Sequence, residues 1–291
     1  MPHTAEHVDF PSAGDVTIAG YRWDPQGEPR AIAQIVHGVG EYALRYTPLA
    51  EALTARGFVV YAHDHRGHGR TLIDGQVPGT LGVDGWPELV ADIGRMAELA
   101  HRAYPTLPLV LIAHSLGSFA TQQVLPDRSF DFDAVALSGT TAVDLLEPAI
   151  DLNVPLDLAA FNAPFEPART EFDWISRDEA QVDAYITDPL CGFGLDIASG
   201  KALFAGARQA ADAARVSSIR SDLPIYITVG DQDPVNGQLA LVNALVDRYR
   251  EAGLSDVTLE VWKDARHEVF NETNRDEVFA HMFEWIDRAL T

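Results

Sequence analysis

The sequence predicts a doubly wound, mostly parallel α/β sheet with an inserted, mainly helical cap, and three observations lead to it. Apolar runs typical of buried strands alternate with segments of helical periodicity over most of the 291 residues. One such run, 109–113, breaks off in a turn with a serine at its tip, and a helical segment follows. The alternation is lost between about 140 and 216, a stretch too long for an ordinary loop. We therefore expect a core of residues 1–139 and 217–291, and a cap of residues 140–216.

The core elements follow one another in an order that the sequence pattern predicts. Runs of apolar and β-branched residues predict strands, and apolar residues spaced three to four apart predict helices. The expected elements are a hairpin of 7–10 and 16–23, a strand 31–36, a helix 46–56, a strand 57–62, a helix 86–104, a strand 109–113, a helix to about 124, a strand 134–137, a strand 224–229, a helix 238–252, a strand 257–262 and a helix 275–290.

The composition restricts the partners and the compartment. The formal net charge is −22 and the pI is near 4.6, so nucleic acids and anionic membrane surfaces are disfavoured as partners. Cys191 is the only cysteine, which excludes an intramolecular disulfide and fits a reducing compartment. Residues 1–6 lack the pattern of a signal peptide, and no apolar run is long enough to cross a bilayer. We expect a soluble, cytoplasmic protein.

Ser115 is the predicted nucleophile, because it occupies the turn after the strand 109–113. A strand, a sharp turn with a serine at its tip and a helix form a nucleophile elbow, which lifts the serine Oγ clear of the sheet. The elbow needs small residues two positions before and after the serine, and Ala113 and Gly117 satisfy this requirement. An ordinary turn serine is the alternative, and the other residues of the predicted site decide between the two.

His267 and an aspartate are the predicted partners of Ser115. A serine hydroxyl needs an imidazole to take its proton, and a carboxylate must orient that imidazole. His267 lies in the loop after the last predicted strand, where such a histidine is expected. Two aspartates follow the preceding strand: Asp231 suits a turn, whereas Asp233 lies farther into the loop, where it could reach the histidine. The order serine, aspartate, histidine is typical of the α/β-hydrolases.

Two backbone N–H groups are expected to form an oxyanion hole. A tetrahedral intermediate needs donors that are already in place where its negative charge develops. One donor is expected from Leu116, the residue after the nucleophile at the start of its helix. The second is expected from the glycine-rich loop 37–40 after the strand 31–36, with Val39 as the donor.

Five segments together resemble the monoacylglycerol lipases and related lysophospholipases. Segment 37–46, HGVGEYALRY, resembles the HGxGExxxRY motif of that family, and 64–71, DHRGHGRT, is similar to DxRGHGxS. Segment 230–235, GDQDPV, is similar to GxxDxxV, which implies that Asp233 is the acid, and 266–272, RHEVFNE, matches RHExxNE. In the insert, the tripeptide DPL at 188–190 resembles the family's cap.

The resemblance covers nearly the whole chain and implies an α/β-hydrolase fold. The sequence departs from the family pattern at 113–118, where AHSLGS stands in place of GHSMGG, and at Thr71, where a serine is usual. The cap is the least similar region. These departures affect the substrate more than the hydrolytic chemistry, because the cap shapes the acyl and alcohol pockets.

The expected activity is that of a serine carboxylic ester hydrolase of the monoacylglycerol lipase or lysophospholipase type. Ser115 would form an acyl-enzyme, and a small-molecule ester or lipid is the expected partner. No cofactor is expected. One alternative is a serine aminopeptidase on the same scaffold, with cap carboxylates holding a free α-amine; the candidates are Glu166, Glu171, Asp173 and Glu179. A catalytically inactive ligand-binding relative is the other, and the complete set of triad residues argues against it.

The cap is expected to provide an apolar tunnel for an acyl chain. Phe161 and Phe193 are the candidate substrate-binding residues, and packing of the cap on the core must account for many of its other apolar side chains. Contact with a membrane or micelle would be transient at most and would occur through the cap. No oligomeric state follows from the sequence.

No metal site is expected. The segment 63–65, HDH, has with His68 a composition like that of a metal site. Metal ligands, however, need convergent geometry and supporting hydrogen bonds, which composition alone does not provide. The resemblance already accounts for this loop as a structural element, and we favour that interpretation.

Overall fold

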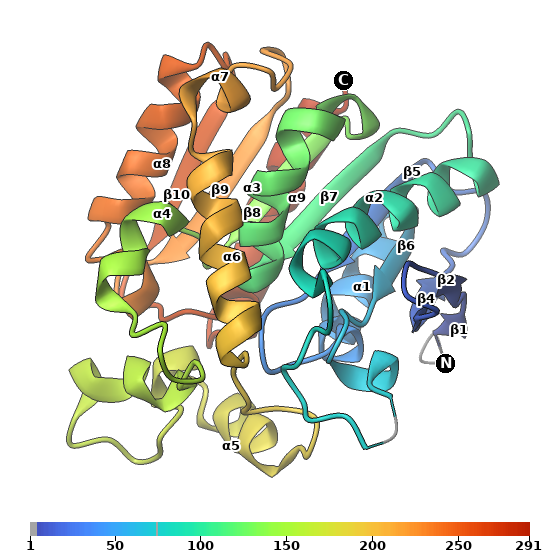
Figure 1. The fold of residues 1–291 in the computed structure, drawn as a ribbon. Helices are drawn as coiled ribbons and strands as arrows, with labels where there is room; N and C mark the ends of the chain where they lie inside the picture. The colour runs from blue at the N-terminus through green and yellow to red at the C-terminus, as the bar shows by residue number, and fades with distance from the viewer. Residues whose placement is uncertain (1–4, 74) are drawn as a thin grey trace.

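The structure, a computed structural model, describes residues 5–73 and 75–291, and within them eight strands form the main sheet (Figure 1). The strand order is β1-β4-β6-β5-β7-β8-β9-β10; the strands from β6 to β10 run parallel, and β1 and β4 are antiparallel at one edge. The strands are β1 (Glu6–His7), β4 (Gly20–Trp23), β5 (Ala31–Val36), β6 (Phe58–His63), β7 (Leu109–His114), β8 (Ala134–Ser138), β9 (Ile225–Gly230) and β10 (Val257–Trp262). The predicted mostly parallel α/β fold is confirmed.

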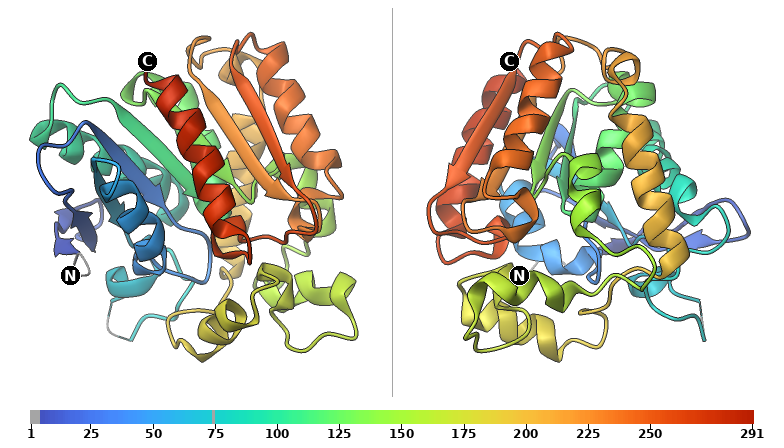
Figure 2. Two further views of the ribbon diagram at one scale, coloured as in Figure 1. Left: turned by 180° about the vertical axis from the view of Figure 1, so that it is seen from behind. Right: turned by 60° about the vertical axis from the view of Figure 1, so that its left-hand side comes forward.

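Helices cover both faces of the sheet (Figure 2). One face carries α1 (Thr47–Thr54) and α9 (Arg275–Ala289), and the other carries α2 (Gly85–Ala103), α3 (Leu116–Arg128) and α8 (Ala240–Glu251). Every residue of β5 to β9 is buried, as expected for parallel strands with helices on both sides. Continuous apolar runs in the sequence therefore mark these strands.

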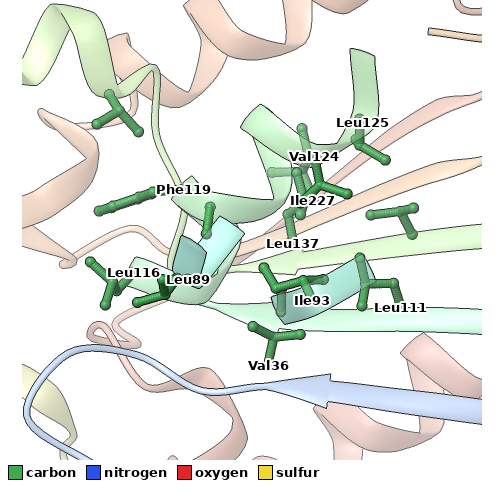
Figure 3. Close-up of a cluster of buried hydrophobic side chains, with 14 of the residues drawn as sticks. Val36, Leu89, Ile93, Leu111, Leu116, Phe119, Val124, Leu125, Leu137 and Ile227 are labelled. Atoms are coloured by element: carbon green, nitrogen blue, oxygen red, sulfur yellow. The ribbon is translucent and has the colours of Figure 1, made fainter. Parts of the chain in front are cut away.

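Side chains of α2 and α3 pack against the central strands in one of the two apolar clusters (Figure 3). Leu89 and Ile93 of α2 and Val124 of α3 meet Leu111 of β7 and Leu137 of β8. Burying each such side chain contributes roughly 1.5–3 kcal/mol, so this face holds the strand before the elbow and the helix after it in fixed positions. The nucleophile elbow is thus built on a rigid part of the molecule.

The N-terminal hairpin differs from its prediction. Its turn-proximal part is a separate two-stranded sheet of β2 (Phe10–Pro11) and β3 (Thr17–Ile18), whereas β1 and β4 pair with each other at the edge of the main sheet. The backbone N–H of Val8 donates to the carbonyl of Gly20 between the two ladders. The hairpin therefore exists, but it changes sheets along its length.

The segment between β8 and β9 has two parts. The helices α4 (Val143–Leu146), α6 (Ile197–Ala210) and α7 (Ala213–Val216) lie beside the sheet, and α6 packs on α2 and α3. The rest lies beyond the carboxyl ends of the parallel strands, in yellow-green and yellow in Figure 1; it contains η4 (Glu147–Ala149), η5 (Leu158–Phe165), η6 (Asp173–Ile175) and α5 (Glu179–Thr187). Cap boundaries at 140 and 216 stay a prediction, and the packing of α6 was not foreseen.

The loops at the strand ends contain short 3-10 turns, and these complete the element order. They are η1 (Ala43–Tyr46), η2 (Gly69–Thr71), η3 (Ser129–Asp131), η7 (Pro234–Asn236) and η8 (Val269–Asn271). None of the helices in the described part of the chain has the length and apolar character needed to cross a bilayer.

Candidate active site

Ser115 stands at a sharp turn between β7 and α3, in a strained backbone conformation. Its φ of 48° and ψ of −120° are rare for a residue with a side chain. Gly117 makes the turn possible, because a Cβ there would lie 2.5 Å from the carbonyl oxygens of Val36 and His37. Ala113 is buried in the last part of β7. The structure thus has the elbow geometry that the sequence predicts.

Ser115, His267 and Asp233 are joined by two hydrogen bonds. Nε2 of His267 lies 2.9 Å from the Oγ of Ser115, and Nδ1 lies 2.9 Å from Oδ2 of Asp233. The other carboxylate oxygen of Asp233 accepts the N–H of Val235 at 2.9 Å, which fixes the carboxylate. All three side chains are buried. Residues that follow three different strands therefore meet at the carboxyl edge of the sheet.

Asp231 does not contact His267. Its Oδ1 accepts the N–H of Asp264 at 2.8 Å and the side-chain amide of Gln232 at 3.0 Å. Asp231 therefore stabilises the adjoining turns of the β9 and β10 loops, as expected of a turn residue. Of the two aspartates that competed in the sequence, the structure brings Asp233 to the imidazole.

The electrostatic surroundings of His267 favour its protonated form. Burial opposes a charge on the imidazole, but the charge of Asp233 and the hydrogen bond to it outweigh burial, with further support from Glu268 and Glu41. The pKa of His267 is therefore raised above its ordinary value. This raises the basicity of the group that lies next to the Ser115 hydroxyl.

The two predicted oxyanion donors belong to segments next to Ser115: Leu116 follows it, and a Cβ on Gly38, the neighbour of Val39, would lie 3.1 Å from the Ser115 Cβ. Leu116 begins α3, and Val39 lies in the loop after β5. Neither N–H has a hydrogen-bond partner within residues 5–73 and 75–291. The N–H of Gly38, by contrast, donates to Oε1 of Glu41 at 2.5 Å. The N–H of Val39 is thus available as a donor, as its predicted role requires.

A buried ion-pair network connects the loop of Val39 with the loop of His267. Arg45 pairs with Glu41 at 2.5 Å and with both carboxylate oxygens of Glu268 at 2.9 Å, and the Tyr46 hydroxyl also donates to Glu41. Burial raises the pKa of Glu41. In Glu268 burial acts in the same direction, but the Arg45 charge outweighs it and lowers the pKa to about 2. The motifs contained these residues, but sequence reasoning gave them no role.

The segment around η6 contacts the loop of His267 directly. The N–H of His267 donates to the carbonyl of Trp174 at 3.3 Å, and the N–H of Glu268 donates to that of Ile175 at 2.7 Å. The rings of Trp174 and His267 lie 4.9 Å apart between centroids. Sequence reasoning missed Trp174, because it lies in a stretch without periodicity and in none of the motifs.

An apolar cavity of about 490 Å³ lies between the inserted segment and the loop of Asp233. It is lined by Leu146, Ala149, Ile150, Asp151, Val154, Pro155, Leu156, Asp157, Ala160, Phe161, Ala163, Pro164 and Pro234. Phe161 thus lines the cavity, and its ring packs on Trp174 at 5.2 Å. Phe193 lies elsewhere: its ring packs on His68 at 5.0 Å, and its carbonyl lies against Gly40. Both substrate-binding assignments stay predictions.

Four buried histidines cluster at the loop of Val39: His37 belongs to this loop, and His63, His65 and His68 come from the end of β6 and the loop after it. The ring centroids of His37 and His65 are 4.1 Å apart, and those of His63 and His65 are 5.2 Å apart. Nε2 of His37 accepts the N–H of His65 at 2.9 Å, and burial lowers the pKa of each of the four rings, including His68. Within the described residues no group of three or more histidine, cysteine or carboxylate side chains is arranged to hold a metal ion.

Comparison with known proteins confirms the family that the motifs predict. A family model described as serine aminopeptidase, S33, matches residues 27–274. A monoacylglycerol lipase of Mycolicibacterium smegmatis is 32% identical over 97% of this chain and 96% of its own. A monoglyceride lipase of Mus musculus is 28% identical over 99% and 94% of the two chains. A solved structure of a thermostable carboxyl esterase from Bacillus coagulans, in complex with glycerol, has a TM-score of 0.86 and 26% identity and covers 99% of each chain. The chain therefore belongs to the serine aminopeptidase S33 family of α/β-hydrolases and is an ester hydrolase similar to the monoacylglycerol lipases.

Proposed function

We propose that this protein hydrolyses monoacylglycerols or closely similar esters of a fatty acid and a small alcohol, through an acyl-enzyme on Ser115. The observation that carries the proposal is the hydrogen-bonded chain of Ser115, His267 and Asp233 close to an apolar cavity of about 490 Å³. The full-length similarity to monoacylglycerol lipases supports the substrate class.

The buried hydrogen bonds support a separate role for each group in the first half of the reaction. His267 Nε2 takes the Ser115 proton while Oγ forms a bond to the ester carbonyl carbon, and the carbonyl π electrons move onto oxygen. The N–H groups of Val39 and Leu116 hold that oxyanion. His267 then gives the proton to the leaving alkoxide as the C–O bond breaks, and Asp233 stabilises the imidazolium throughout.

Water completes the cycle by the same steps. His267 takes a proton from a water molecule whose oxygen attacks the acyl-enzyme carbonyl, and then returns the proton to Ser115 Oγ as the fatty acid leaves. Apart from this water molecule, both halves of the reaction use groups of this chain. Because the predicted catalytic side chains are already hydrogen-bonded to one another, little reorganisation is required when an ester binds.

The lining of the cavity supports an alkyl chain as the acyl part of the substrate. Its two charged residues, Asp151 and Asp157, are exposed, and Asp157 caps η5 by accepting the N–H of Ala159. The remaining lining is aliphatic, aromatic or proline. An alkyl chain gains free energy by leaving water for such a surface, whereas a charged acyl group would lose hydration without finding a partner.

The aminopeptidase alternative receives less support from the inserted segment. Glu166, Glu171 and Glu179 are exposed, and none of them lines the cavity. Asp173 is buried, but its carboxylate accepts the N–H of Arg169 and the hydroxyl of Thr170. A bound α-amine would have to displace these local partners. Hydrolysis of a p-nitrophenyl ester panel, compared with aminoacyl-p-nitroanilides, separates the two activities.

The direct test is the variant Ser115→Ala. A fluorophosphonate probe should label the wild-type protein once, and the variant should lose both labelling and hydrolysis of monoacylglycerols. Ser118→Ala is a matched control: its hydroxyl donates to the carbonyl of Ser115 within α3, and labelling should persist. Labelling that survives in Ser115→Ala would refute the nucleophile, and an inactive ligand-binding protein would leave both proteins unlabelled.

Two further predictions concern the location of the protein and its contact with membranes. A cytoplasmic location is supported by the single cysteine, which fits a reducing compartment. Transient contact with a membrane or micelle through the inserted segment is supported by exposed apolar residues there, among them Val154 and Ile186. Both stay predictions.

A further inference from the structure

Trp174 covers the imidazole of His267. The two ring centroids are 4.9 Å apart and the ring planes are inclined by 39°. Both side chains are buried, with 4% of Trp174 and 3% of His267 exposed. An indole ring at this distance lies within the range over which an aromatic face attracts a cation.

The position of the indole is fixed from several directions. Asn162 Oδ1 accepts the backbone N–H of Trp174 at 2.9 Å, and the backbone carbonyl of Trp174 accepts the backbone N–H of His267 at 3.3 Å. The ring of Phe161 packs on the indole at 5.2 Å between centroids. The indole Nε1 has no partner in residues 5–73 and 75–291, so packing rather than its N–H sets the ring position. Backbone and ring therefore both connect this segment to His267.

The remaining sides of His267 are occupied by other groups. Ser115 and Asp233 hold the two ring nitrogens. A Cβ on Gly139 would lie 3.0 Å from Cε1, and the ring of His114 is 4.8 Å away between centroids. His114 is buried, and burial lowers its pKa, so it stays neutral beside His267.

The charges near His267 come from three loops. Asp233 follows β9, Glu268 is the next residue in the chain, and Glu41 belongs to the loop before η1. Arg45 pairs with both glutamates and so offsets their attraction for a proton on His267. Among the groups in ring contact with His267, the indole is the one with a large electron-rich face.

We propose that Trp174 is a positioning residue for ester hydrolysis, whose indole face holds the His267 imidazole between Ser115 and Asp233 and stabilises the imidazolium formed when Ser115 gives up its proton. This inference rests on the proposed function. It assigns to the inserted segment a part in the chemistry as well as in substrate binding. The imidazolium is transient and buried away from water, so a neighbouring aromatic face has more influence on it than it would in solvent.

The test compares the acid limb of the pH profile of kcat/KM in Trp174→Leu and in the wild type. The limb reports the pKa of His267 in the free enzyme. Loss of the aromatic face should move it downward by about 0.5–1 pH unit. Looser positioning should lower kcat by about tenfold or more with little change in KM. Trp174→Phe, which keeps an aromatic face, should shift the limb by less than half as much.

Two further measurements and one control variant keep the test independent of folding and substrate. Fluorinated tryptophan placed only at position 174 keeps the ring shape but weakens its negative face, and the limb should fall progressively with fluorination. Phe172 packs on Tyr185 rather than on His267. The variant Phe172→Leu is therefore the control, and the acid limb of its pH profile should not move. The pH dependence of fluorophosphonate labelling gives the same limb without any ester substrate.

The direction of the shift decides the outcome. An upward shift in Trp174→Leu would mean that the indole only keeps water away from His267, and no shift would mean that it acts through packing alone; either result overturns the proposal. Both would leave ester hydrolysis intact. Failure of the proposed function itself would appear separately, as unchanged labelling in Ser115→Ala.

Discussion

The loops at the carboxyl edge of the sheet and the inserted segment 147–196 form the two sides of the candidate site, and they were unequally predictable. In the edge loops, residue type and position after a strand indicated Ser115, His267 and two candidate aspartates, and the resemblance to the family motif then favoured Asp233. In the inserted segment, the apolar residues suggested an acyl tunnel with Phe161 in it, but no pattern pointed to Trp174 or to the position of the cavity. Parallel strands end at one edge, so their loops meet there whatever the sequence between them. A segment without a periodic pattern has no comparable rule to place its side chains.

The contacts of the two regions also differ in kind. The edge loops are held by side-chain hydrogen bonds and ion pairs, as between Arg45 and Glu268. The inserted segment reaches the site through aromatic packing, as between Phe161 and Trp174, and through backbone hydrogen bonds to the loop of His267. One ion pair, between Arg177 and Glu272, adds to these contacts. We therefore expect changes in the edge loops to affect the rate and the stability, and changes in the segment, other than at Trp174, to affect which substrate is used.

The largest effect is expected from Asp233→Asn. An amide cannot hold the imidazole in the required tautomer, and in serine proteases this change costs on the order of 10⁴ in kcat. Asp231→Asn is the matched control in the same loop, and it should lose little activity because the Asp231 carboxylate accepts hydrogen bonds from Asp264 and Gln232 rather than from His267. Steady-state kinetics of both variants would check the assignment. The opposite ranking would transfer the role of the acid to Asp231.

Most of the fold and part of the site were accessible from the sequence. The strands 31–36 and 257–262 were predicted with the bounds that the structure gives them. A run of mostly apolar residues marks the first, which is buried throughout, and β-branched and aromatic residues mark the second, which is half-buried at the edge of the sheet. The helix α6 was missed because it lies in a stretch where other apolar residues obscure its period. The link from Arg45 to Glu268 depends on contacts between loops far apart in the chain, which one sequence does not reveal.

Arg45→Met should have the next largest effect, this time on stability. It leaves Glu41 and Glu268 buried without their partner, and breaking a buried ion pair in this way costs about 3–5 kcal/mol. Arg215→Met is the control, because its pair with Asp127 is largely exposed and contributes about 0.2–1 kcal/mol. Urea unfolding of both variants measures the difference. Equal losses would show that the network does not hold the edge loops.

Acid should weaken the edge loops through the buried histidines. The pKa values of His63 and His68 are lowered to about 4 by burial, below the ordinary value of 6.5. Between pH 6.5 and about 4 the unfolded chain binds protons that the folded chain excludes, so stability falls as the pH falls in that window. His63→Leu removes one such group and should reduce the slope by up to about 1.4 kcal/mol per pH unit.

Urea midpoints measured at several pH values within this window would check the effect. The control is Val59→Ala, which changes a buried residue of the same strand without removing a titratable group. That variant should keep the wild-type slope. A slope unchanged in His63→Leu would mean that this ring is already protonated in the folded protein.

The smallest expected effects, and the sharpest test of the inserted segment, come from varying the acyl chain one carbon at a time. Each methylene buried in the cavity should contribute about 0.8 kcal/mol, which is roughly fourfold in kcat/KM, until the cavity is full. Ordering of a flexible chain reduces this gain. In a series of p-nitrophenyl esters or monoacylglycerols, kcat/KM should therefore rise and then stop rising at a definite length.

Phe161→Ala should move that length upward, because Phe161 lines the cavity. Phe193→Ala should change the rate for all lengths alike, because Phe193 packs on His68 and Gly40 beside the Val39 loop. A profile that is flat, or highest for acetate, would mean that the cavity does not take the acyl chain.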